Sequence, residues 1–157
     1  MAIWQFTVGL VPRVWVEKEG NAPAMLYDAD GYCDTSIAWR QNQPKVDLDV
    51  LMSQVLPATE SKIDEMKFWG DETKSDIQVC YDGNTVESVQ VRIDTRVDST
   101  ALCLKIVELA RALDCCLLFP EARFLSIPHE GSICNALQNS TAARFSAAPR
   151  EFLSGLA

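Results

Sequence analysis

Alternating apolar and polar side chains predict most of the strands in this chain. Apolar residues alternate with polar ones over residues 77–81 and again over 89–93, and the turn formers Asp82, Gly83 and Asn84 lie between the two stretches. This pattern is typical of a β-hairpin. β-Branched and aromatic residues predict further strands over residues 3–16, with an end or bend at Pro12, and over residues 68–69, 115–119 and 124–127.

Apolar residues at helical spacing predict four helices. Between residues 48 and 55 they recur at i, i+3, i+4 and i+7, with Asp47 before them as an N-cap and Pro57 after them. A second helix begins after Asp98 or Ser99 and has one apolar face. Helices are also predicted over residues 132–139 and 149–156, and a loop with one short helical turn over residues 17–34.

These elements predict one α+β domain. Their order is strand, helix, hairpin, helix, two strands and two helices, and no repeat or flexible linker divides residues 1–157. The simplest arrangement is a mostly antiparallel sheet with the helices packed on one face. A chain of 157 residues is long enough to bury a core without a metal or a disulfide.

The net charge of the chain limits the kinds of molecule that it can bind. The chain carries 22 Asp and Glu against 14 Lys and Arg, which gives a formal net charge of −8, and the acid excess lies within the first 98 residues. A negative protein repels a phosphate backbone and attracts a positive surface. We therefore expect no nucleic-acid partner, and the charge favours a basic protein. The alternative is that the acidity serves only solubility.

Cysteines and the N-terminal residues indicate the compartment. Most cysteines lie among apolar residues of predicted helices or strands, where reduced thiols pack as small apolar groups. Residues 1–6 lack the basic start of a signal peptide, and no apolar run is long enough to cross a membrane. We therefore expect a cytoplasmic protein that does not bind a membrane. The cysteines are Cys33, Cys80, Cys103, Cys115, Cys116 and Cys134.

Catalytic and metal-binding patterns are missing from the sequence. His129 is the only histidine, and there is no C-x-x-C pair and no glycine-rich nucleotide loop. The acidic run 28–34 has the carboxylate spacing of a calcium loop, but its twelfth position, counted from Asp28, is Trp39 instead of Glu. We therefore expect a solvated turn there. The sequence nominates no catalytic residue, no metal ligand and no cofactor.

Aromatic residues beside carboxylates are the best candidates for a partner-binding surface. An exposed tryptophan next to acidic residues combines an apolar anchor with a charged rim. One such group precedes the predicted hairpin, and another surrounds the acidic run 28–34. The alternative is that each tryptophan is a core residue and each acidic segment a solvated loop. The candidates are Trp69, Asp71, Glu72 and Asp76 in the first group and Asp28, Asp30, Asp34 and Trp39 in the second.

Several short strings resemble a known kind of protein. Residues 34–39 (DTSIAW), 69–72 (WGDE), 76–79 (DIQV), 92–94 (RID) and 145–153 resemble a family of small uncharacterised bacterial proteins. In size, acidity and lack of motifs the chain is also similar to immunity proteins, which neutralise bacterial toxins. That likeness implies a non-enzymatic protein that binds a basic toxin through an acidic surface. The alternative class is a small enzyme or ligand-binding domain whose site is assembled from scattered residues.

Overall fold

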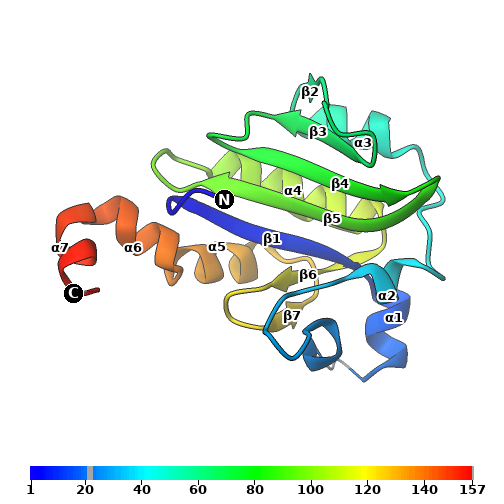
Figure 1. Cartoon of the computed structure of the whole chain (residues 1–157), viewed down its shortest axis with the longest axis horizontal. Helices are drawn as coiled ribbons and strands as arrows, with labels where there is room; N and C mark the ends of the chain where they lie inside the picture. The colour runs from blue at the N-terminus through cyan, green and yellow to red at the C-terminus, as the bar shows by residue number, and fades with distance from the viewer. Residues whose placement is uncertain (21–22, 157) are drawn as a thin grey trace.

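A computed structural model describes residues 1–20 and 23–156 and contains one antiparallel sheet (Figure 1). In this part of the chain the sheet has seven strands in the order β2-β3-β4-β5-β1-β6-β7, and all neighbouring strands are antiparallel. The strands are β1 (Gln5–Pro12), β2 (Ala58–Thr59), β3 (Met66–Gly70), β4 (Asp76–Asp82), β5 (Thr85–Asp94), β6 (Cys115–Phe119) and β7 (Phe124–Ser126).

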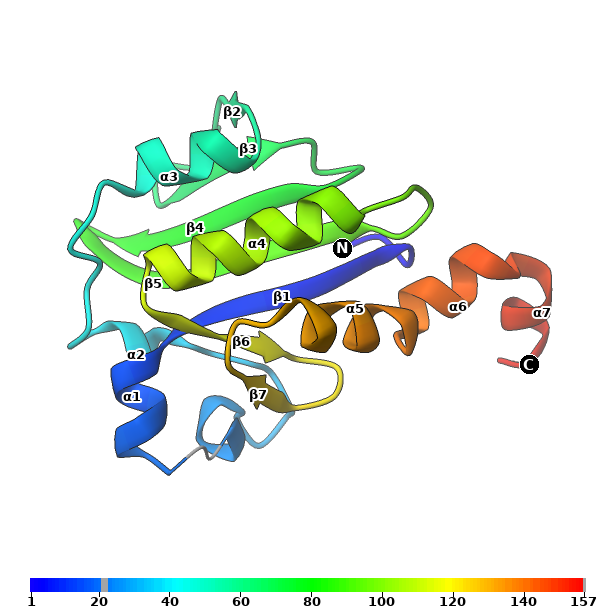
Figure 2. The same cartoon turned by 180° about the vertical axis from the view of Figure 1, so that it is seen from behind.

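The longer helices cover one face of this sheet (Figure 2). On that face α4 contacts both α3 and α5, and α6 and α7 continue from α5 beyond the ends of the strands. This arrangement confirms the predicted α+β fold, a mostly antiparallel sheet with helices packed on one face. The helices are α1 (Arg13–Lys18), α2 (Ser36–Trp39), α3 (Leu48–Val55), α4 (Thr100–Ala112), α5 (Glu130–Gln138), α6 (Thr141–Ala147) and α7 (Pro149–Ser154), with a 3-10 turn η1 (Pro23–Leu26).

The main core lies between the sheet and these helices. Strand alternation sends Val89, Val91 and Ile93 of β5 inward, where they pack with the apolar face of α4. The predicted hairpin is confirmed as β4 and β5, with Gly83 at a φ of 60° in the turn. The predicted cap of α3 is also confirmed, because the Asp47 side chain accepts hydrogen bonds at the start of that helix.

Two differences from the predicted elements have local causes. The predicted first strand ends at Pro12, which confirms one of the two outcomes predicted there, but the β-branched and aromatic residues that follow form the helix α1. Proline has no N–H for a strand ladder, so the chain leaves the sheet there and buries Trp15 on a helix. The apolar pattern also does not predict α6, which begins where the Ser140 hydroxyl accepts a hydrogen bond from the Ala143 N–H at 3.1 Å.

The opposite face of the sheet is only partly covered. Over its β6–β7 end, α1, η1 and α2 contribute to a second apolar cluster, which includes Leu26, Ala38 and Leu118. The predicted loop over residues 17–34 is therefore partly right, because η1 supplies the short helical turn, whereas Asn21 and Ala22 lie outside the described residues. On this side α2 contacts β5 and β1, and within the described chain no helix covers β3 and β4 (Figure 1).

Candidate functional site

The candidate site is the side of β1, β3, β4 and β5 that faces away from the main core, which we call the open face (Figure 1). Strand register places polar side chains next to one another on it, because Asp76 pairs with Arg92 and Gln78 pairs with Gln90. Phe68 of β3 lies beside Gln78 on the same side. Two hollows lie on the open face, a larger one of about 940 Å³ and a smaller one of about 530 Å³.

Carboxylates dominate the charged lining of both hollows. Seven acidic side chains line the two hollows, together with two basic side chains, Lys62 and Arg92. Because Arg92 is already paired with Asp76, the open face carries a net negative charge. The carboxylates are Asp34, Glu87 and Glu121 at the larger hollow and Glu60, Asp71, Glu72 and Asp76 at the smaller one.

A buried ion pair forms a shared floor of the two hollows, because Arg92 lines the larger one and Asp76 lines the smaller one. Arg92 Nε donates to Asp76 Oδ1 at 2.7 Å, and Arg92 Nη2 donates to Asp76 Oδ2. Gln78 Nε2 donates to Asp76 Oδ2 at 3.2 Å, and Gln90 Nε2 donates to Gln78 Oε1 at 2.7 Å. Asp76 is 1% exposed, and its hydrogen bonds raise the pKa of Arg92. This network joins two strands through charge-assisted hydrogen bonds, so the floor is polar and fixed.

The acidic turn over residues 71–75 is held against β1. Gln5 Nε2 donates to the backbone oxygens of Glu72 at 2.9 Å and Lys74 at 2.7 Å. Asp71 Oδ1 accepts from the backbone N–H of Thr73 at 2.8 Å and from its hydroxyl at 2.7 Å, and these bonds lower the pKa of Asp71. The Asp71 carboxylate and the backbone of Glu72 therefore have defined positions.

A stacked pair of side chains supports the same turn from outside the sheet. The Arg96 guanidinium lies 4.2 Å from the centre of the Trp4 ring. Both side chains donate to the backbone oxygen of Thr73 at 3.1 Å. Asp94 holds Arg96 through two hydrogen bonds of 2.9 Å, and this pairing lowers the pKa of Asp94. The turn is thus attached to both β1 and β5.

The second predicted group of carboxylates forms a compact turn at the edge of the larger hollow. Asp28 Oδ1 accepts from the backbone N–H groups of Asp30 and Tyr32, both at 2.9 Å. Asp34 Oδ1 accepts from the backbone N–H of Ser36 at 2.9 Å, which lowers the pKa of Asp34. Of these three carboxylates, Asp34 lines the hollow. Among the described residues, no group of three or more His, Cys, Asp or Glu is placed to hold a metal ion.

Three of the eight predicted partner-binding residues are buried. Trp69 is 3% exposed and donates to Ser53 Oγ at 3.2 Å, and Trp39 is 1% exposed and donates to a β1 carbonyl at 3.0 Å. The Asp76 carboxylate is buried in an ion pair with Arg92, so it is not available to a partner. The interpretation of both tryptophans as exposed anchors is therefore wrong. The aromatic residue of β3 on the open face is Phe68, because strand alternation turns it outward when Trp69 points inward.

Three charged groups and one thiol of the open face have shifted pKa values. Pairing raises the pKa of Arg92 and local hydrogen bonds lower the pKa values of Asp34 and Asp71, so all three stay charged at neutral pH. Burial raises the pKa of the Cys33 thiol, which lines the larger hollow, so the thiol stays protonated and is a poor nucleophile. The carboxylates of Asp34 and Asp71 are therefore negative charges that attract a cationic ligand.

Sequence reasoning nominates Asp76 but misses the other residues that build the floor and support the rim. One signal for the floor is present, because Gln78, Gln90 and Arg92 occupy the polar positions of the two alternating strands. No linear signal connects Gln5 with Glu72, which is 67 positions away. That contact depends on β1 lying beside β5 in the sheet.

Comparisons with known proteins assign no family to the chain. No family model matches it, and no curated protein or solved structure shows a match. The resemblance to small bacterial proteins and the likeness to immunity proteins therefore stay predictions. Over residues 1–20 and 23–156, none of the helices combines the length and the apolar character needed to span a bilayer.

Proposed function

We propose that this protein is a non-enzymatic protein-binding domain of the immunity or inhibitor type, which receives a basic segment of a partner on its acidic open face. The observation that carries the proposal is the seven carboxylates that line two hollows of one uncovered sheet face, against two basic side chains. A negative surface attracts a positively charged partner over a distance, which speeds their association, and it repels acidic partners.

The smaller hollow suits a lysine or arginine side chain. Phe68 forms part of its lining, and Glu60, Asp71 and Glu72 surround it. The aliphatic stem of a basic residue packs on an aromatic ring while its charged head stays near carboxylates. Because the turn over residues 71–75 is fixed before binding, little conformational entropy is lost when a partner docks.

The same proposal assigns the protein to the cytoplasm. All six cysteines are free thiols in the structure, and the thiols of Cys103, Cys115 and Cys116 are buried. Free thiols persist in a reducing compartment, whereas oxidising compartments convert suitably placed pairs to disulfides.

Affinity capture from the native host, with a rim variant and a matched control, tests the proposal. The rim variant changes Glu60, Glu72 and Glu87 to Lys, because these carboxylates line the hollows and their side chains hold no hydrogen bond of the described fold. The first two flank the smaller hollow, and Glu87 flanks the larger one.

The control variant carries the same change of charge on the helices. It changes Glu108 of α4, Glu130 of α5 and Glu151 of α7 to Lys, all of which are exposed. We expect the parent and the control to retain a stoichiometric basic protein that the rim variant loses. With that protein purified, the association rate should fall as salt shortens the screening length to about 8 Å. Equal capture by both variants would show that the acidity serves only solubility.

A further inference from the structure

The larger hollow of the open face is elongated along two neighbouring strands. Residues between positions 5 and 9 of β1 and between positions 87 and 92 of β5 line it, and these strands lie side by side in the sheet. Five residue steps along a strand span about 16 Å. The hollow is therefore long enough for an extended segment of about five residues.

A glycine deepens the middle of this hollow. Strand register places Gly9 of β1 between Gln90 of β5 and Leu118 of β6, so a row of side chains across the sheet is interrupted there. A Cβ at Gly9 would make ordinary contact with Leu118, at 3.5 Å, and φ lies outside the left-handed region. The position therefore accepts a side chain, and its absence leaves room above the floor.

Arg92 presents an unpartnered donor to the hollow. Its side chain is 10% exposed, and its Nε and Nη2 are bonded to Asp76, which lines the smaller hollow. Nη1 has no hydrogen-bond partner among the described residues. Every side-chain nitrogen or oxygen of the described fold that is sealed from solvent has a partner, so Nη1 is reached from the larger hollow, which Arg92 lines.

The acceptor that fits Arg92 Nη1 is a neutral carbonyl oxygen. Asp76 already neutralises the guanidinium, and the carboxylates of Asp34, Glu87 and Glu121 line the same hollow. These three charges repel a ligand carboxylate, whereas an amide carbonyl gains a charge-assisted hydrogen bond without that cost.

Two of the three carboxylates lie at one end of the hollow. The Thr35 hydroxyl donates to the backbone oxygen of Glu87 at 3.2 Å, and Asp34 directly precedes Thr35 in the chain. The helix α2 begins at the next residue and contacts β5 and β1. Asp34 and Glu87 therefore form one negative end, at the opposite end of the β5 lining from Arg92.

Glu121 lies at the other end, near the start of β1. Its carboxylate accepts from the backbone N–H of Thr141 at 2.9 Å. The helix α6, which begins at Thr141, contacts β1. The Thr95 hydroxyl lies 2.6 Å from the Trp4 oxygen and 3.0 Å from the Ala142 oxygen, which holds the start of α6 beside the start of β1.

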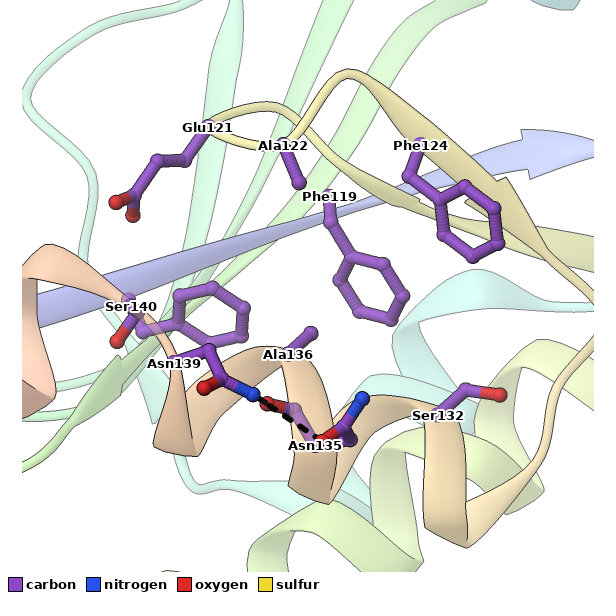
Figure 3. A pocket seen from close by; sticks show the side chains of 10 residues that line it. Phe119, Glu121, Ala122, Phe124, Ser132, Asn135, Ala136, Asn139 and Ser140 are labelled. Atoms are coloured by element: carbon purple, nitrogen blue, oxygen red, sulfur yellow. Dashed lines mark hydrogen bonds between the residues drawn. The ribbon is translucent and has the colours of Figure 1, made fainter.

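The charge of Glu121 is directed away from a neighbouring cavity. That separate cavity, of about 460 Å³, lies between the β6–β7 hairpin and α5 and has Glu121 at its edge. Figure 3 shows the Glu121 side chain pointing away from the rings of Phe119 and Phe124, which line the cavity. Because Glu121 also lines the larger hollow, its charge contributes to that hollow.

We propose that the larger hollow binds an extended segment of the basic partner with a positive side chain at each end. The segment runs over Gly9, and one of its backbone carbonyls accepts from Arg92 Nη1. The two positive side chains lie near the carboxylates at the two ends of the hollow. This inference rests on the proposed function and adds to it the backbone contact and the spacing of the partner's charges.

Titration of the ¹⁵N-labelled protein with the peptide acetyl-Arg-Ala-Ala-Ala-Arg-amide, followed by two-dimensional ¹⁵N–¹H NMR, tests the proposal. We expect saturable shifts at the backbone amides of Thr7, Gly9 and Gln90. The peptide acetyl-Arg-Arg-Ala-Ala-Ala-amide has the same composition with adjacent charges and should bind about threefold or more weakly. Spermidine carries three positive charges but no carbonyl, and should bind about fivefold or more weakly despite its higher charge.

Variants of Gly9 locate the binding without changing a charge or a donor. Gly9→Val fills the middle of the hollow and should weaken binding of the spaced peptide by about tenfold or more, because the added side chain occupies the space of the peptide backbone. Gly155→Val makes the same change at the exposed C-cap of α7 and should bind the peptide as the parent does. If Gly9→Val does not fold, Gly9→Ala, whose Cβ makes only ordinary contacts, should give a smaller loss of affinity in the same direction.

The proposal is wrong if the spaced peptide shifts no residue of the hollow, or if spermidine or the peptide with adjacent arginines binds as tightly. It is also wrong if the folded Gly9 variants bind the spaced peptide as the parent does. A host protein that Gly9→Val captures and the rim variant loses would refute this inference and leave the proposed function standing. Equal capture by the rim variant and its control would refute the proposed function itself.

Discussion

The buried pair of Asp76 and Arg92 allows a quantitative test of the open face. Arg92→Met keeps most of the side-chain volume and removes the guanidinium, which leaves the Asp76 carboxylate unpaired at 1% exposure. Asp76→Ala removes the other partner. The matched control is Arg13→Met, because Arg13 makes the same two-bond contact with Asp114, at 2.7 and 2.9 Å, on the protein surface.

The difference in exposure sets the expected magnitudes. The side chains of Arg92 and Asp76 are 10% and 2% exposed, whereas those of Arg13 and Asp114 are 43% and 60% exposed. Removing one partner of a buried pair costs about 3 to 5 kcal/mol, because an uncompensated charge stays buried. Breaking an exposed pair costs about 0 to 1 kcal/mol. In a domain of this size the first loss lowers the Tm by roughly 6 to 20 °C.

Urea unfolding, followed by the fluorescence of the buried tryptophans, measures these losses of unfolding free energy. We expect the m-value of each variant to equal that of the parent. The double variant Asp76→Ala/Arg92→Met should cost little more than Arg92→Met alone, because either change already breaks the pair. The coupling energy should therefore be close to the cost of Asp76→Ala alone, about 3 to 5 kcal/mol. If Arg92→Met lowers the free energy of unfolding by no more than Arg13→Met, the pair is effectively solvated, and our description of a fixed polar floor is wrong.

Three further variants test the supports of the site by the same unfolding measurement. Trp69→Ala should cost about 3 to 5 kcal/mol as a core residue, and a cost below about 1 kcal/mol would contradict its burial. Gly70→Ala should destabilise by about 1 kcal/mol or more, because φ is 88° and a Cβ would lie 2.4 Å from the Ser75 carbonyl oxygen, and an unchanged midpoint would contradict this geometry. Pairing with Arg96 lowers the pKa of Asp94, so its contribution is complete above the ordinary pKa near 3.9 and is lost as pH falls through the folded value. Asp94→Asn should therefore be less stable than the parent at pH 7 and lose less stability between pH 5 and 2, and parallel pH profiles would contradict the pairing.

The sequence predicts the fold well where a period can be read over several residues. The strands β4 and β5 each show four or more alternating positions, so both their existence and the side that faces the core follow from the pattern. The strand β3 is shorter, and its residues Lys67, Phe68 and Trp69 do not establish a phase. Pairing of Trp69 with Ile77 fixes that phase in the sheet, which is why the wrong aromatic residue is predicted at the surface.

The candidate site is less predictable because it depends on strand order. The acidity of the segment 71–76 is visible in the sequence, but its attachment to Gln5 requires β1 to insert between β5 and β6. The cavity beside α5 similarly needs Phe6 to meet Phe119 from a distant part of the chain. Contacts of this kind come from topology, which a single sequence specifies only weakly.

The ion pair also determines where the negative charge of the open face acts. A buried pair is weak evidence for added stability, since desolvation offsets much of the attraction between its partners. Arg92 neutralises Asp76 at the floor, so the field that reaches solvent comes from the exposed rim, such as Glu60 and Glu72. A partner's cation therefore meets uncompensated carboxylates first at the rim, while the floor keeps the two strands and the adjoining turn in fixed register.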